Sequence, residues 1–174
     1  MKVRLLNKSK FEAPKYAHEG DAGIDLKADF SKVSTITLKV KGDFAVINNP
    51  DSAINEGENP IKVLKIYPNT RVLIPTNLHV QLPKGTQLEI RPRSGWALKE
   101  GITVLNSPGT VDFNYTGNIG VILINHGYEP VSIEHGDRIA QAVLMPYHSI
   151  EWEEVDSLED TDRGMTGFGD SGKK

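Results

Sequence analysis

The stretch NIGVILINHGYEPVSIEHGDRIAQAVLM, residues 118–145, decides the fold class. It holds three short apolar runs rich in Val and Ile, at Asn118–Asn125, Val131–Ile133 and Ile139–Met145. Turn-forming residues separate them, most clearly His135-Gly136-Asp137. Val and Ile suit the pleated surface of a sheet, and short apolar runs between turns are typical of strands. We therefore expect three consecutive strands in this stretch.

The same pattern continues toward the N-terminus. Further apolar runs that we expect to be strands lie at Val3–Leu6, Thr35–Val40, Ile61–Ile66, Val72–Pro75, Gln87–Ile90 and Ile102–Leu105. A turn signal, Leu82-Pro83-Lys84-Gly85, falls between two of them. The best helix candidate is short, Ser94–Glu100. Many short strands with regular turns predict an all-β sandwich, barrel or jelly roll.

Two segments differ from this pattern. Lys41–Pro60 is polar and rich in turn residues, which favours a long loop or an irregular hairpin. Thr161–Lys174 is rich in Gly and Ser and has one large aromatic residue, Phe168. Such a segment cannot bury enough surface to fold alone. We expect one β domain over residues 1–160 and a flexible C-terminal arm over 161–174.

The bulk properties exclude several classes of protein. The chain has 174 residues, a formal net charge of −3 and no cysteine. The charge argues against a protein that coats nucleic acid. No apolar run is long enough to cross a bilayer or to act as a signal peptide, so we expect no membrane association. The absence of cysteine excludes disulfides and thiolate metal sites and agrees with a cytoplasmic protein.

Two segments concentrate groups that could bind or cleave a nucleotide. In Arg91-Pro92-Arg93-Ser94-Gly95 the guanidinium groups, the hydroxyl and free N–H groups suit phosphate. Taken alone, this segment is better explained as a strand end with solvated arginines. Asn106–Gly117 looks like a hairpin of high polarity, in which Asp112 could act as a general base and Tyr115 could pack on a sugar. A plain hairpin explains its glycines but not Asp112 and Tyr115 together.

Other polar positions have ordinary explanations when taken singly. Asp137-Arg138 is best explained as an ion pair that fixes a turn, and Gln141 as a residue on the solvated face of its strand. Asp25 could hold a metal ion through water or anchor a turn. The tail Arg163–Gly172 could approach phosphates through its glycines and stack Phe168 on a base, or could be a disordered terminus.

Together, five of these segments resemble the five motifs of the trimeric dUTPase family, in the family's order. They are Ala22-Gly23-Ile24-Asp25-Leu26, Arg91–Gly95, Asn106–Gly117, Gly136–Gln141 and Arg163–Gly172. The resemblance implies a jelly-roll homotrimer whose three active sites are each built from all three subunits. It implies an enzyme that hydrolyses dUTP to dUMP and pyrophosphate with Mg²⁺, which keeps uracil out of DNA and supplies dUMP for thymidylate synthesis. The enzyme would work in the cytoplasm, or in the host cytoplasm if it is viral.

The resemblance also implies a role for individual residues. Asp112 would activate the attacking water, Asp25 would position Mg²⁺ through its water shell, and Tyr115 would pack under the deoxyribose. Asn106 and the hairpin backbone would read uracil, and the hairpin would exclude a 5-methyl group and a 2′-hydroxyl by shape. The remaining substrate contacts would come from the second motif, the hairpin, the fourth motif and a neighbouring subunit's tail: Arg93, Ser94, Gly95, Gly109, Thr110, Val111, Gln141, Arg163, Phe168, Gly169 and Ser171.

The chain departs from the family pattern in the arm and the hairpin. Met165 and Thr166 are atypical, the latter replacing a glycine, and Thr116 and Asn118 are neutral where charged residues are usual. The segment 41–60 is longer than in compact members and could contact a partner protein.

A dCTP deaminase and a regulatory binding protein are the alternative functions. A dCTP deaminase needs a glutamate three residues before an asparagine, but Ile122 stands three residues before Asn125 and cannot transfer protons. A regulatory binding protein that uses the same fold as a nucleotide-gated switch stays open as an added function.

Overall fold

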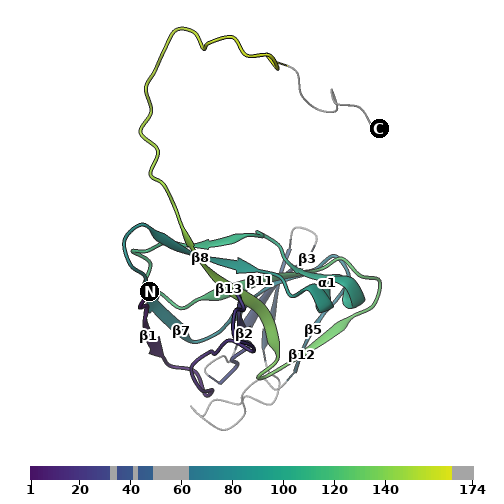
Figure 1. The fold of residues 1–174 in the computed structure, drawn as a ribbon. Coiled ribbons are helices and arrows are strands. Elements are labelled where there is room, and N and C mark those ends of the chain that lie inside the picture. Colours follow the sequence, from purple (N-terminus) through teal and green to yellow (C-terminus); the bar gives the residue numbers. More distant parts are fainter. Residues whose placement is uncertain (32–34, 41–42, 49–62, 166–174) are drawn as a thin grey trace.

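The computed structural model describes residues 1–31, 35–40, 43–48 and 63–165, and these form a β-rich body with one short helix (Figure 1). The first strands are β1 (Arg4–Asn7), β2 (Ile24–Lys27), β3 (Thr35–Val40), β4 (Asp43–Asn48), β5 (Val63–Ile66), β6 (Arg71–Pro75) and β7 (Leu78–Gln81). They are followed by β8 (Thr86–Arg91), α1 (Ser94–Glu100), β9 (Ile102–Val104), β10 (Gly109–Val111), β11 (Gly120–Asn125), β12 (Val131–Glu134) and β13 (Arg138–Pro146).

The strands form two larger sheets and two strand pairs. One sheet has the order β10-β8-β13-β2 and the other the order β4-β3-β6-β11-β9. The pairs are β1-β7 and β12-β5, and all the pairings are antiparallel. Few neighbours in these sheets are consecutive in sequence, so most pairings join distant segments.

A single hydrophobic core joins these sheets. Its side chains come from both larger sheets and from β5, β7 and β12, and its largest fully buried members include Phe30, Leu64, Ile74, Leu123 and Ile139. Burying each aliphatic side chain contributes about 1.5–3 kcal/mol. The common core therefore fixes the two sheets relative to each other, and with them the residues at their ends.

The all-β prediction is confirmed, and the helix and β3 have the predicted bounds. The turns at Gly85 and Gly136 are also confirmed; φ is 83° and 99° there, which favours glycine. Four strands were not predicted: β2, β4, β7 and β10. Three of these, β2, β7 and β10, have polar residues between their apolar ones and so contain no continuous apolar run.

Part of the segment 41–60 lies within the described residues. Its residues 43–48 form β4, which pairs with β3 from Thr35↔Asn48 to Val40↔Asp43. These six residues are therefore one strand of a hairpin whose other strand, β3, precedes the segment, while residues 41–42 and 49–60 lie outside the described residues. At the other end, the chain leaves the body after β13 as an extended segment (Figure 1). Within the described ranges, no helix has the length and apolar character needed to span a membrane.

Candidate functional site

Three strands place a row of polar side chains across one sheet. Gln141 on β13 pairs with Asp25 on β2 at one side and with Arg91 on β8 at the other. Successive residues along a strand point to opposite faces of the sheet, whereas residues paired across strands point to the same face. The register therefore decides which side chains meet. The row ends where β8 leads into Pro92, Arg93 and the first turn of α1. Sequence segments more than 40 residues apart thus meet at the end of the sheet where β8 stops.

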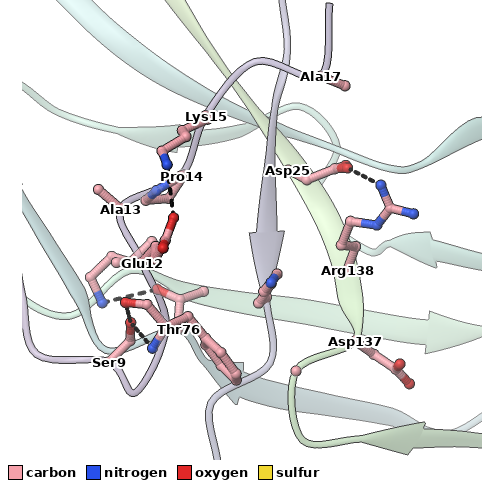
Figure 2. A pocket seen from close by; sticks show the side chains of 14 residues that line it. Ser9, Glu12, Ala13, Pro14, Lys15, Ala17, Asp25, Thr76, Asp137 and Arg138 are labelled. Atoms are coloured by element: carbon pink, nitrogen blue, oxygen red, sulfur yellow. Dashed lines mark hydrogen bonds and ion pairs between the residues drawn. The ribbon is translucent and has the colours of Figure 1, made fainter.

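Asp25 is held between two arginines in this row. Its Oδ1 accepts a hydrogen bond from Arg93 Nε at 3.1 Å, and its Oδ2 accepts one from Arg138 Nη1 at 3.1 Å. Arg93 Nη1 also donates to the carbonyl oxygen of Arg138 at 3.2 Å. Figure 2 shows Arg138 directed at Asp25. We call Asp25, Arg93 and Arg138 the arginine cluster. Two cations share one carboxylate in it, so the cluster keeps an excess positive charge that suits a phosphate chain.

The interpretation of Asp137-Arg138 as an ion pair with each other is therefore wrong. Asp137 does fix the turn, but through its Oδ2, which accepts the backbone N–H of Glu134 at 2.8 Å. Arg138 pairs instead with Asp25, 113 residues away. Sequence reasoning gave Arg138 no place among the site residues; the available signal was its position two residues after Gly136 in the fourth motif-like segment.

Gln141 is also not on a solvated face. Its side chain is half-buried, and its Nε2 donates to the carbonyl oxygen of Pro92 at 2.9 Å. A Cβ added at Gly23 would collide with Gln141 Oε1, so the glycine leaves the space that the amide occupies. Arg91 is not freely solvated either, because Glu89 accepts hydrogen bonds from its Nε at 2.9 Å and its Nη2 at 2.6 Å.

The segment 106–117 is not a simple hairpin. The strands on either side of it, β9 and β11, pair with each other, but the chain between them crosses to the other sheet. There β10 pairs with β8, from Gly109↔Ile90 to Val111↔Leu88. Gly109 and Val111 are buried, whereas Thr110 and Asp112 are exposed, as alternation along a strand requires.

A tight turn follows β10 and presents Asp112 and Tyr115. The backbone N–H of Tyr115 donates to the carbonyl oxygen of Asp112 at 3.1 Å, and Tyr115 Oη donates to the carbonyl oxygen of Asn118 at 3.0 Å. The aromatic ring lies so close to Gly117 that a Cβ there would collide with it. Asn106, at the other end of the segment, is exposed, and its Nδ2 lies 3.2 Å from the position of a Cβ added at Gly109.

Within one chain, Asp112 and the arginine cluster lie toward opposite ends of the sheet. Asp112 follows the pair Val111↔Leu88, whereas Gln141 pairs with Arg91. The three residue steps from Leu88 to Arg91, at about 3.3 Å each, separate the two positions by roughly 10 Å along β8. Arg93 lies two residues beyond Arg91, after the end of β8. Asp25 lies on β2 in the same row as Arg91. The fold brings Asp25, Arg93 and Gln141 together, but it does not bring Asp112 and Tyr115 to them.

The remaining predicted residues lie at the surface or outside the described part. Ser94 and Gly95 are exposed at the start of α1, whose N-cap residue is Arg93. Arg163 is exposed in a turn closed by a hydrogen bond from Gly164 N–H to the carbonyl oxygen of Thr161 at 2.9 Å. Phe168, Gly169 and Ser171 lie outside the described residues.

A pocket of about 490 Å³ opens beside the arginine cluster (Figure 2). The N-terminal loop 9–17, β2 and the turn before β13 line it, and Asp25 and Arg138 form part of its wall. Asp112 and Tyr115 are not among its lining residues. Among the residues described, no group of three or more His, Asp or Glu side chains could hold a metal ion directly.

Comparisons with known proteins agree on one family. The family model for dUTPase matches residues 61–172. A deoxyuridine 5'-triphosphate nucleotidohydrolase from Gloeothece citriformis is 42% identical over 99% of this chain and 96% of its own length. One with the same name from Clostridium tetani is 40% identical, over 99% and 97% of the two chains.

Solved structures agree in fold. The Staphylococcus bacteriophage 80alpha dUTPase with dUPNHPP matches with a TM-score of 0.70 and 23% identity, over 98% of both chains. A mutant dUTPase from phage phi11 of S. aureus, described as revealing the coordination of a structural Mg(II) ion, matches with a TM-score of 0.64 and 19% identity, over 92% of this chain and 100% of that one.

Proposed function

The chain belongs to the dUTPase family, and from this premise we propose how its residues hydrolyse dUTP to dUMP and pyrophosphate. The reaction needs a nucleophilic water, a site that accepts the triphosphate charge and a surface that selects deoxyuridine. Each of these needs corresponds to a separate group of residues in the fold.

The arginine cluster at Asp25 binds the phosphate chain in this proposal. Arg93 is oriented by Asp25, and Gln141 is oriented by the carbonyl oxygen of Pro92, so both side chains are held before substrate arrives. Such orientation lowers the entropy cost of forming charge-assisted hydrogen bonds with phosphate. Ser94 and Gly95 add donors at the exposed start of α1.

The residues fit a water-mediated Mg²⁺ beside the phosphates. Mg²⁺ is commonly held by one or two carboxylates together with water and substrate phosphates. Asp25 is the carboxylate in this cluster, and both its oxygens keep lone pairs beyond those used by Arg93 and Arg138. The ion would neutralise phosphate charge when bound, while Asp25 would orient its water shell.

Asp112 is the general base. It is exposed at the end of β10, where a water can reach its carboxylate. Asn106, Gly109, Thr110 and Val111 read uracil through the neighbouring backbone, and Tyr115 packs under the deoxyribose. Removal of a proton from the attacking water by a positioned carboxylate is worth about two to four orders of magnitude in rate.

Within one chain, Asp112 is separated from the arginine cluster. This separation is the main support for sites shared between subunits. A base roughly 10 Å or more away along the sheet cannot activate a water that attacks a phosphate bound at Asp25 and Arg93. A second copy that supplies its own Asp112 removes the difficulty. We therefore propose a cyclic homotrimer in which each site joins the 106–117 segment of one subunit to the arginine cluster of another, and the 161–174 arm of a subunit closes over it.

Kinetics of Asp112→Asn test this assignment. The variant should retain dUTP binding and lose turnover by about two to four orders of magnitude, because the amide cannot accept the proton. Pyrophosphate release from dUTP, dCTP and UTP should be measured in parallel with wild-type protein, which should prefer dUTP. Near-normal turnover by Asp112→Asn would remove Asp112 from the mechanism without affecting the family assignment.

A further inference from the structure

The segment that follows Tyr115 is attached to β7 and to the turn before it. His79 Nδ1 lies 3.0 Å from the carbonyl oxygen of Thr116. Because a carbonyl oxygen only accepts, Nδ1 carries the proton and donates. Two residues along, Asn118 Nδ2 donates to Asn77 Oδ1 at 3.2 Å. The backbone N–H of Ile119 donates to the carbonyl oxygen of Leu78 at 2.8 Å, so three contacts along the segment hold residues 116–119.

Tyr115 is tied to this anchored segment at its far end. Its Oη donates to the carbonyl oxygen of Asn118 at 3.0 Å. The ring is half-exposed, at 46%, so packing alone does not fix its orientation. Its hydroxyl end lies against Gly117. The position of the ring therefore depends on the hydroxyl contact and on the position of the Asn118 backbone.

Asn77 is itself rigidly placed. It is buried, and its φ of 54° lies in the left-handed region, which asparagine tolerates better than most residues. Its Nδ2 points to the backbone oxygen of Asp29 at 3.4 Å. A fixed acceptor at Asn77 gives Asn118 a fixed partner.

The Asn118 side chain links Asn77 to the backbone that accepts Tyr115 Oη. Its Nδ2 donates to Asn77 Oδ1, and the backbone carbonyl oxygen of the same residue accepts the tyrosine hydroxyl. The contact with Asn77 therefore restrains the carbonyl oxygen that holds the end of the ring.

We infer that His79 and Asn118 are positioning residues that hold the Tyr115 ring where it discriminates deoxyribose from ribose. The inference rests on the proposed packing of Tyr115 under the sugar. A ring held at both its backbone and its hydroxyl leaves no space for a 2′-hydroxyl, whereas a loosened ring moves aside and admits it. Neither His79 nor Asn118 needs to touch substrate for this effect.

Steady-state kinetics with dUTP and UTP test the inference on the full chain. His79→Ala and Asn118→Ala should each lower the ratio of kcat/KM for dUTP to that for UTP by about 3- to 10-fold, as expected for one lost hydrogen bond. The change should appear mainly in KM, which should rise for dUTP as packing is lost and fall for UTP as the 2′-hydroxyl is admitted, because sugar packing acts on bound substrate and transition state alike. His79→Asn places an amide donor near the Nδ1 position and should restore the ratio.

A matched control and a variant that leaves His79 and Asn118 unchanged complete the experiment. His126→Ala changes an exposed histidine beyond the other end of β11 and should leave the ratio unchanged. Tyr115→Phe removes only the hydroxyl and should reproduce the loss even if a change at His79 impairs folding.

The outcomes separate the inference from the proposed function. If Tyr115→Ala destroys discrimination while His79→Ala, Asn118→Ala and Tyr115→Phe keep it, the inference is overturned and the role of Tyr115 stands. If Tyr115→Ala also keeps discrimination, the packing of Tyr115 under the sugar is wrong and the inference fails with it.

Discussion

At the scale of single residues, Gly23 and Gln141 act as one unit. The missing side chain of Gly23 provides the space for the Gln141 amide, which donates to Pro92 next to Arg93. We predict that Gly23→Ala displaces this amide and lowers kcat/KM for dUTP by about tenfold, the equivalent of one charge-assisted hydrogen bond. The clash involves the end of a flexible side chain, so the fold should survive.

A double-mutant cycle checks this coupling. Gly23→Ala should have little further effect in a Gln141→Ala background, because the group it displaces is already gone. Fully additive losses in kcat/KM would show that Gly23 acts independently of Gln141.

Asp29 gives a prediction for acid stability. Its side chain is fully buried, and burial raises its pKa, but hydrogen bonds from Ser31 and from the backbone N–H of Lys10 outweigh this and hold the pKa below its usual value of 3.8. A carboxyl with a lowered pKa in the folded state stabilises the protein above its unfolded pKa, and this contribution is lost as the pH falls through the folded pKa.

Asp29→Asn should therefore lower the free energy of unfolding near neutral pH by about 1.5–3 kcal/mol. The difference from wild type should shrink below about pH 4, where the wild-type carboxyl begins to lose its advantage. Denaturant titrations across pH measure this, with the exposed Asp156→Asn as control. A difference that stays constant down to pH 2 would contradict the prediction.

How much of the site could be predicted from sequence depends on how far apart in the chain the two residues of each contact lie. Asp25, Arg93 and Gln141 were identified through motif resemblance, and the fold does bring them together. Taken alone, Gln141 pointed to the solvated face because its partner, Pro92, lies 49 residues away. Arg138 was missed for the same reason, since its partner Asp25 is distant in sequence. Local patterns cannot show a partner that only the sheet register supplies.

At the scale of elements, the strength of the local apolar pattern decided which elements were predictable. β3 and α1 have the predicted bounds, and β8, β11 and β13 were placed within two residues at each end. β2, β7 and β10 are short and carry polar residues such as Asp25 and His79, so their apolar pattern is weak. Pairing with β13, β1 and β8 stabilises them instead. Tertiary pairing of this kind overrides local propensity.

The C-terminal segment carries the prediction at this scale. A chain ended at Asp162 should keep the fold, because the body and its core end before the extended segment that leaves β13. Turnover should fall by about ten- to a hundredfold or more, since a base–aromatic stack by Phe168 is worth roughly 1–3 kcal/mol and Arg163 and Ser171 would be lost as well.

Graded variants separate closure from a general defect. Phe168→Ala should give a milder loss of turnover than the truncation, and Thr166→Gly should not reduce activity. Full turnover by the truncated chain would mean that the arm has no part in the reaction.

At the scale of the whole molecule, the proposed reaction depends on how the two halves of the site are brought together. The register places Asp112 and the arginine cluster toward opposite ends of the sheet in one chain. Their functions must combine on one substrate, so we propose that the 106–117 segment of one subunit works with the arginine cluster of another. A trimer in sedimentation would agree with this claim but would not show that sites are shared.

Mixing two inactive variants tests the claim most directly. Asp112→Asn removes the base and Arg93→Ala removes part of the phosphate site, and each variant alone should be nearly inactive. Coexpressed with different tags and purified as mixed oligomers, they should regain activity, because a site can take Asp112 from one subunit and Arg93 from another. In a closed ring of three subunits, every mixed oligomer has one intact site out of three. Mixed oligomers no more active than either variant alone would contradict the account.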